Sequence, residues 1–116
     1  MNSTFDIRHQ AQENCDLFIL SGRVDAKAAP AFELAVLKTF DNKRYKIVLN
    51  LADVSFMSSS GLRVLISLSQ EAKKHWGGEV RLAAVNERIL DVMNLAGLTS
   101  LFQIFDTVSE ACESFS

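Results

Sequence analysis

The pattern of apolar and polar residues predicts five β-strands. Residues 5–12 alternate apolar and polar side chains, which is typical of a half-buried strand, and Glu13-Asn14 suits a hairpin turn before a second strand at 15–21. Residues 45–51 are almost continuously apolar, which indicates a central strand covered by helices. Two further strands are expected at residues 80–85 and 101–105.

Apolar residues that recur near the helical period of 3.6 predict four helices, three between these strands and one after the last strand. The first helix carries Pro30 in its first turn, where the missing N–H is tolerated, and it closes at Asp41-Asn42. The others span residues 59–76, 88–96 and 108–115. The resulting order, ββαβαβαβα, predicts an α/β fold: a single domain over residues 1–116 with one mixed central β-sheet and helices packed against it.

Composition and charge reduce the number of possible functional classes. The chain has 116 residues, of which 48% are apolar and 22% charged, as in ordinary globular domains. A net charge of -2 excludes the basic footprint of a nucleic-acid-binding protein. No apolar run approaches the roughly 20 residues of a membrane span, and residues 1–12 do not resemble a signal peptide. We therefore expect a cytoplasmic protein in which Cys15 and Cys112 are free thiols that pack as small apolar groups.

Residues that could support catalysis are few. His9 and His75 are the two histidines, and both are expected at the surface. The sequence has no Gly-x-Ser-x-Gly nucleophile motif, no Gly-rich phosphate loop with a lysine and no metal-ligand spacing. A receiver domain would need an aspartate at Asn50 and an acidic pair where Gln10-Ala11-Gln12 ends the first strand. We therefore predict that the chain is not an enzyme and needs no cofactor or metal.

Residues 53–62 join the central strand to the second helix and hold the most specific signal. Ser58 is a suitable N-cap, since its oxygen can accept a hydrogen bond from a free amide of the first turn. With Ser58 as the cap, Met57 and Leu62 occupy the positions of a hydrophobic staple. Gly61 lowers helix propensity by about 1 kcal/mol, which suggests that close access is needed there.

A phosphate on Ser59 would be compatible with this helix. The helix start offers free N–H groups and the positive end of the dipole, so added negative charge would leave the fold intact. The phosphate would bring about -1.5 to -2 charges to the surface and change what that surface can bind. Arg63, one turn later, could pair with the phosphate, although a solvated side chain also explains it. A plain capped loop remains the alternative explanation for the serine run.

Three motifs, spread over nearly the whole chain, resemble the STAS domain family of bacterial anti-sigma-factor antagonists. Residues 54–62 are similar to the family's Asp-Ser-Ser/Thr-Gly-Leu signature, which follows an apolar strand. Residues 20–25 resemble the family's first turn. Residues 96–98, with Leu101 and Phe102, are similar to its C-terminal motif.

The resemblance implies a switch. In such proteins a partner serine kinase, which also holds a sigma factor, phosphorylates the first serine after the aspartate. The unphosphorylated antagonist binds this kinase and frees the sigma factor, and a metal-dependent serine/threonine phosphatase resets the antagonist. Ser59 is then the phosphoacceptor, and the expected partner-binding residues are Asp25, Ser58, Ser60, Gly61, Leu62 and Arg63. Asp25 matches a family aspartate that contacts the kinase or shapes the pocket, but an N-cap for the first helix is an equal alternative.

The chain departs from the family pattern at two positions. Ser58 stands where the family has the aspartate before the acceptor, and Asn50 stands where an aspartate often follows the central apolar run. Both changes remove negative charge, which we expect to lie near the acceptor. They favour a second interpretation: a STAS module that is never phosphorylated and acts as an adaptor in a signalling complex or transport assembly. The triple serine favours the switch, with the exposed face of residues 59–73 docking the partner.

Overall fold

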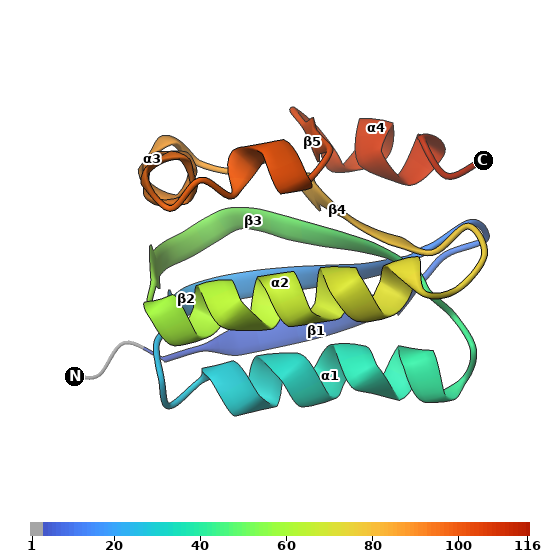
Figure 1. The fold of residues 1–116 in the computed structure, drawn as a ribbon, viewed down its shortest axis with the longest axis horizontal. Helices are drawn as coiled ribbons and strands as arrows, with labels where there is room; N and C mark the ends of the chain where they lie inside the picture. The colour runs from blue at the N-terminus through green and yellow to red at the C-terminus, as the bar shows by residue number, and fades with distance from the viewer. Residues whose placement is uncertain (1–3) are drawn as a thin grey trace.

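A five-stranded mixed sheet with the order β1-β2-β3-β4-β5 forms the centre of the molecule (Figure 1). The computed structural model describes residues 4–116. Within them the strands are β1 (Asp6–Ala11), β2 (Asp16–Val24), β3 (Lys46–Met57), β4 (Glu79–Ala83) and β5 (Ile104–Phe105). β1 pairs antiparallel with β2, and the other neighbouring strands pair in parallel. The predicted mixed sheet, with residues 45–51 in its central strand, is therefore confirmed.

Helices cover both faces of this sheet. Residues 4–116 contain α1 (Ala29–Asp41), α2 (Ser59–Lys73), α3 (Glu87–Leu95), α4 (Val108–Glu113) and the short 3-10 helix η1 (Thr99–Leu101). α1 and α2 lie side by side, while α3 and α4 lie across β3 from them (Figure 1). Alternate residues of a strand point to opposite faces. Ile47 and Leu49 accordingly join the main core with α1 and α2, whereas Val48 packs in a second cluster with Ala111 of α4.

Strand β3 is much longer than the sequence pattern predicted. It continues past Leu51 to Met57, and its pairing with β2 continues from Asp53 opposite Ser21 to Met57 opposite Val24. Two register shifts interrupt this pairing, one between Ile19 and Ser21 and one after Gly22. Because these irregularities disturb the two-residue alternation, the buried residues of the extension are Leu51, Val54 and Met57, every third position. The extension therefore lacks the period by which a strand is identified.

Two other predicted boundaries were wrong. The expected strand at 101–105 begins only at Ile104, because Thr99–Leu101 form the 3-10 helix η1 and Phe102 enters the main core after it. The second helix ends at Lys73 and not at residue 76, and Trp76 lies in the following turn with 97% of its surface exposed. The first error comes from a short apolar run, which does not distinguish strand from helix, and the second lies at a helix end, where sequence patterns fix the boundary least well.

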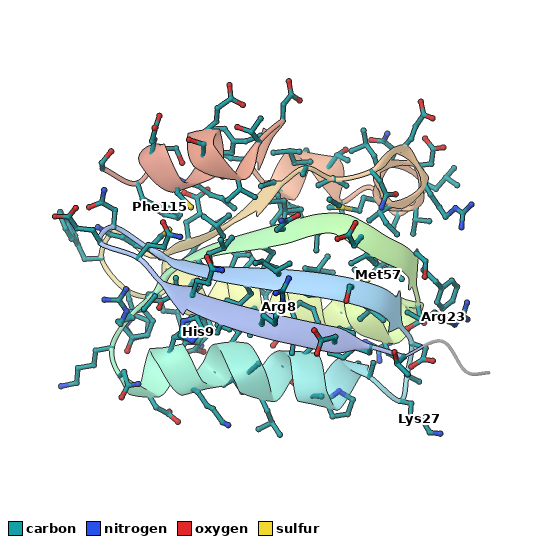
Figure 2. All side chains as sticks on the ribbon, turned by 180° about the vertical axis from the view of Figure 1, so that it is seen from behind. Arg8, His9, Arg23, Lys27, Met57 and Phe115 are labelled. Carbon is teal, nitrogen blue, oxygen red and sulfur yellow. The ribbon has the colours of Figure 1, made fainter. Side chains whose placement is uncertain are left out.

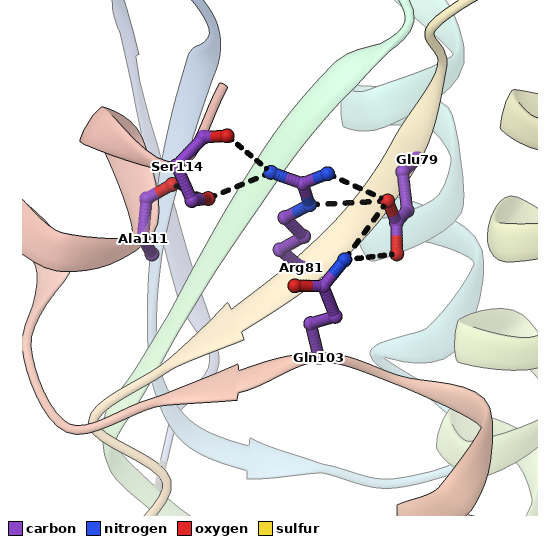
Figure 3. A network of polar contacts seen from close by, with 5 residues as sticks. All are labelled: Glu79, Arg81, Gln103, Ala111 and Ser114. Atoms are coloured by element: carbon purple, nitrogen blue, oxygen red, sulfur yellow. Dashed lines mark hydrogen bonds and ion pairs between the residues drawn. The ribbon is translucent and has the colours of Figure 1, made fainter. Parts of the chain in front are cut away.

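An arginine on β4 holds the C-terminal helix in place (Figure 3). Arg81 Nη1 donates to the Ser114 carbonyl at 2.8 Å and to its Oγ at 2.7 Å, while Nη2 donates to Glu79 Oε1 at 2.8 Å. The guanidinium also lies over the ring of Phe115, 3.9 Å from its centroid. Gln103 Nε2 donates to the same Glu79 carboxylate at 3.2 Å. The end of α4 is thus fixed to the sheet by charge-assisted hydrogen bonds as well as by apolar packing.

Candidate functional site

One end of the molecule brings together the carboxyl ends of β2 and β3 and the starts of α1 and α2 (Figure 1). Val24 and Met57 are register partners there, and the Ser58 N–H donates to the Val24 carbonyl at 2.9 Å. Residues that are far apart in the sequence, Asp25 and Ser59, therefore follow directly after two paired strand ends. Figure 2 shows Arg23 and Met57 at this same end.

At the start of α2, one serine caps the helix and the next serine is exposed to solvent. Ser58 has extended backbone angles, φ -79° and ψ 172°, and its Oγ accepts a hydrogen bond from the Gly61 N–H at 3.2 Å. The predicted N-cap is confirmed. Ser59 is the first helical residue and is exposed, while Ser60 is half-buried. The hydroxyl that caps the helix and the hydroxyl expected to accept a phosphate thus belong to neighbouring residues.

Gly61 allows close packing in the interior of the protein. It is buried, and a Cβ atom placed on it would lie 2.5 Å from Met57 Sδ, 2.9 Å from Val24 Cγ1 and 3.1 Å from the Val24 carbonyl oxygen. The glycine lets the first turn of α2 approach the end of β2. The close approach that we expected at Gly61 is thus made by residues of the protein itself, Val24 and Met57. Leu62, the predicted staple partner of Met57, is half-buried against the same core.

Asp25 caps the turn that leads into α1. Its Oδ1 accepts hydrogen bonds from the Lys27 N–H at 3.1 Å and from the Ala28 N–H at 3.0 Å. Residue 28 is the N-cap of α1 and makes no side-chain cap bond, and both amides that Asp25 binds precede the helix. The alternative that Asp25 is the N-cap of the first helix is therefore wrong, because Asp25 holds the turn before it. The Asp25 side chain is nevertheless half-exposed at the same end as Ser59.

The structure adds a surface pair that the sequence pattern did not reveal. Arg23 and Phe56 face each other across β2 and β3, and the Arg23 guanidinium lies 4.1 Å from the centroid of the Phe56 ring. Phe56 remains 36% exposed. Arginine and aromatic side chains are enriched among residues that dominate binding energy at protein interfaces. The extension of β3 makes these two residues neighbours, so the pair could not be predicted from the sequence pattern.

Asn86 braces the extension of β3 from its other side. β4 pairs with β3 only as far as Ala83 opposite Asn50, so the later carbonyls of β3 have no strand partner on that edge. Asn86 Nδ2 donates to the Val54 carbonyl at 2.8 Å, and Arg88 Nη1 donates to the Ser55 carbonyl at 3.3 Å. Asn86 Oδ1 in turn accepts from the N–H of residue 89 at 3.1 Å and caps α3. One side chain therefore fixes both the extension and the helix beside it.

An open hollow of about 780 Å³ lies between the β3 extension and the start of α3. Its lining combines carboxylates, the cation of Arg88 and the braced backbone of β3. The lining residues are Ala52, Asp53, Val54, Ser55, Asn86, Glu87, Arg88 and Asp91.

The structure places Asn50 away from the acceptor. Asn50 lies opposite Ala83 in the middle of β3, where its Oδ1 accepts from the Ala52 N–H at 3.0 Å. At about 3.3 Å per strand residue, Asn50 is on the order of 20 Å from Ser59. Our expectation that this asparagine removes charge near the acceptor was therefore wrong. Of the two departures from the family pattern, only Ser58 lies at the start of α2. Arg63, one turn beyond Ser59, is exposed.

Within residues 4–116, no group of three or more His, Cys, Asp or Glu side chains is arranged to hold a metal ion. No helix in that part of the chain is long and apolar enough to cross a membrane.

Comparison with known proteins identifies the family of this chain. The STAS domain family profile matches residues 6–111. The chain belongs to the STAS domain family. The match includes both strand ends, the capped start of α2 and the braced β3 extension.

Two relatives illustrate where this STAS domain stands among known proteins. It is 36% identical over 86 residues to a candidate anti-sigma factor antagonist of Thermotoga maritima, covering 73% of this chain and 75% of the relative. It is 27% identical over 104 residues to the anti-sigma-B factor antagonist of Bacillus subtilis, covering 90% of this chain and 92% of the relative.

Solved structures share the fold over nearly the full length. An anti-sigma factor antagonist from Mycobacterium paratuberculosis superposes with a TM-score of 0.82 at 21% identity, covering 97% of this chain and 94% of that one. The Bacillus cell fate determinant SpoIIAA in its phosphorylated form superposes with a TM-score of 0.74 at 20% identity, covering 97% of this chain and 100% of that one. A sulfate transporter family protein from Wolinella succinogenes superposes with a TM-score of 0.76 at 17% identity, covering 90% of this chain and 87% of that one. The STAS fold is thus found in proteins of more than one kind.

The packing at Gly61 makes a direct prediction for this STAS domain. Gly61→Ala should destabilise the protein by about 1 kcal/mol or more, because overpacking against Val24 outweighs the gain in helix propensity. Urea unfolding measures the difference, with Ser67→Ala on the exposed part of α2 as the matched control. An unfolding midpoint for Gly61→Ala equal to or above that of the wild type would contradict the steric role of this glycine.

Proposed function

We propose that this STAS domain is an anti-sigma-factor antagonist whose binding is switched by phosphorylation of Ser59. In its unphosphorylated form it binds an anti-sigma factor that is also a serine kinase, and the sigma factor is released. The observation that carries the proposal is the exposed hydroxyl of Ser59 at the first position of α2, while Ser58 supplies the cap. The names of the relatives support the class of partner.

A phosphate at this position is compatible with the fold. The first turn of α2 carries free N–H groups and the positive end of the helix dipole, which stabilise negative charge. The Ser58 cap bond and the Ser58–Val24 backbone bond do not involve the Ser59 hydroxyl. Phosphorylation therefore adds about -1.5 to -2 charges to the surface and leaves the contacts that hold the helix start in place. Arg63, exposed one turn later, is positioned to pair with the added charge.

Replacement of the family aspartate by Ser58 fits this scheme physically. Serine and aspartate are comparable N-caps, so the structural role is kept. The replacement removes one negative charge beside Ser59 and so reduces repulsion against a phosphate. It also removes a carboxylate that a kinase could contact, so the partner's surface should differ at this point from that of relatives with the aspartate.

The docking surface in this proposal has two parts. The first is the start and exposed face of α2, from Ser59 and Arg63 towards Lys73, with the half-buried Ser60 and Leu62 at its edge. The second is Asp25 with the Arg23–Phe56 pair at the paired strand ends. Negative charge at Ser59 would lie at the beginning of the first part, where it would oppose an acidic partner surface or one that excludes a phosphate.

The remaining elements of the proposal follow from the switch. A serine/threonine phosphatase removes the phosphate, the chain itself performs no catalysis, and the exchange takes place in the cytoplasm, where sigma factors meet their anti-sigma factors.

A second candidate function is a STAS adaptor that is never phosphorylated, in a signalling complex or a transport assembly. The absence of the aspartate before Ser59 favours it. The fold does not decide between the two candidates, because a sulfate transporter family protein shares it. Modification of Ser59 separates them.

Incubation with the organism's anti-sigma-factor serine kinase and ATP should raise the intact mass of the wild-type protein by about 80 Da, one phosphate. Ser59→Ala should gain nothing, while Ser60→Ala, the matched control, should gain the same 80 Da. Equal gains for wild type and Ser59→Ala would exclude Ser59 as the acceptor, and no gain in any of them would favour the adaptor.

Ser59→Asp should weaken binding to the same kinase at least tenfold, because a fixed negative charge lies on the docking surface. Its thermal unfolding midpoint should stay close to that of the wild type, since an acidic side chain is favourable in a first helical turn. Calorimetric titration and a melting curve measure the two effects. Unchanged affinity would oppose the switch, and a large loss of stability would show that Ser59 is a structural residue.

A further inference from the structure

The fold brings the two cysteines together, although almost the whole domain separates them in the sequence. Cys15, just before β2, is buried in a small cluster with Leu17, Val48 and Ala111, and Cys112 of α4 packs against this cluster. Cys15 and Cys112 also line the same small cavity. In the structure, which describes residues 4–116, both cysteines are free thiols.

The position of Cys112 is fixed from both directions along α4. On its N-terminal side Ala111 is fully buried in the cluster that contains Cys15. On its C-terminal side, Ser114 accepts two hydrogen bonds from Arg81 (Figure 3), and Phe115 lies under the same guanidinium. Cys112 therefore cannot move far from Cys15 while α4 stays on the sheet.

A small oxidant can reach the pair. A cavity of about 190 Å³ opens beside the two cysteines, and Cys112 is partly exposed. The volume is enough for several water-sized molecules, since one water occupies about 30 Å³ in the liquid. The residues that line the cavity are Gln12, Glu13, Asn14, Cys15, Cys112 and Glu113.

We propose that Cys15 and Cys112 are a redox-modification site, at which a peroxide converts the two thiols into an intramolecular disulfide within the native fold. The sulfur of Cys112, as thiolate, attacks one oxygen of hydrogen peroxide, the O–O bond breaks, and the departing hydroxide takes up a proton to give water and a sulfenic acid. The sulfur of Cys15 then attacks the Cys112 sulfur. The S–O bond breaks as the S–S bond forms, and the hydroxide that leaves takes the Cys15 proton, so two thiols and one peroxide give one disulfide and two waters.

The surroundings of the two sulfur atoms determine that Cys112 reacts with the peroxide before Cys15 does. Burial, followed by the hydrogen bond with Cys112, raises the pKa of the Cys15 thiol to about 12. Cys15 therefore stays protonated near neutral pH, and the thiolate is the form that attacks a peroxide. The more exposed Cys112 is oxidised first, and Cys15 resolves the sulfenic acid.

The bond would join the start of β2 to the last helix. Because a disulfide that closes a long loop constrains the unfolded chain most, the oxidised protein should unfold at a higher temperature than the reduced one. The site lies on α4 and the hairpin turn, away from the start of α2, so this inference is independent of the proposed function.

The test treats the reduced full-length protein with hydrogen peroxide, removes the oxidant, unfolds the sample and adds iodoacetamide. The reduced protein should take up two alkyl groups and the oxidised protein none. Peptide mapping without reductant should show Cys15 linked to Cys112, and dithiothreitol should restore both thiols. The oxidised protein should melt roughly 5 °C or more above the reduced one.

Single variants separate the two steps. Cys15→Ser should stop at a sulfenic acid on Cys112 that dimedone traps, and Cys112→Ser should keep Cys15 as a free thiol under the same treatment. A wild-type protein that gains oxygen atoms on Cys112 while Cys15 stays alkylatable, or that forms only intermolecular dimers, would overturn the proposal. An oxidised protein that melts below the reduced one would also overturn it, because the bond would then form only by distorting the fold.

Discussion

The candidate functional end of the molecule depends on the pairing of β2 with β3 beyond the point where β4 stops. This pairing runs through two irregular steps to Val24 opposite Met57, and the Ser58 N–H continues it with a bond to the Val24 carbonyl. Asn86 takes the place of the missing strand on the other edge by donating to the carbonyls of the extension. Since only Ser58 separates Met57 from the start of α2, the position of the first turn of α2 is set by these backbone bonds.

The switch proposed for this STAS domain follows from how the first turn of α2 divides its tasks. Ser58 holds the helix start through its own hydroxyl and N–H, and Gly61 allows the turn to pack closely against Val24. Ser59 lies between them in the sequence, takes part in neither contact and is exposed to solvent. A charge added at Ser59 can therefore change a docking surface without removing any interaction that positions it.

Local chemistry was predictable from the sequence, and contacts between distant segments were not. The Ser58 cap, Pro30 in the first turn of α1 and the buried centre of β3 each follow from a few neighbouring residues. The β3 extension was missed because irregular pairing replaces its alternation with a three-residue burial pattern. Gly61 indicated a close approach, but the residue that makes this approach, Val24, belongs to a strand far away in the sequence and could not be named. The meeting of the cysteines likewise depends on where α4 packs.

Amide hydrogen exchange, resolved by residue, tests the central claim most directly when the unphosphorylated and Ser59-phosphorylated proteins are compared. The Ser58 N–H bonded to Val24, and the Gly61 N–H bonded to Ser58 Oγ, report on the two contacts that hold the start of α2. We predict that both amides keep their protection within a factor of about three when the phosphate is added, since local opening free energies should change little. A fall in protection of tenfold or more at either amide would show that the phosphate unravels the helix start, and would contradict a switch that acts through surface charge alone.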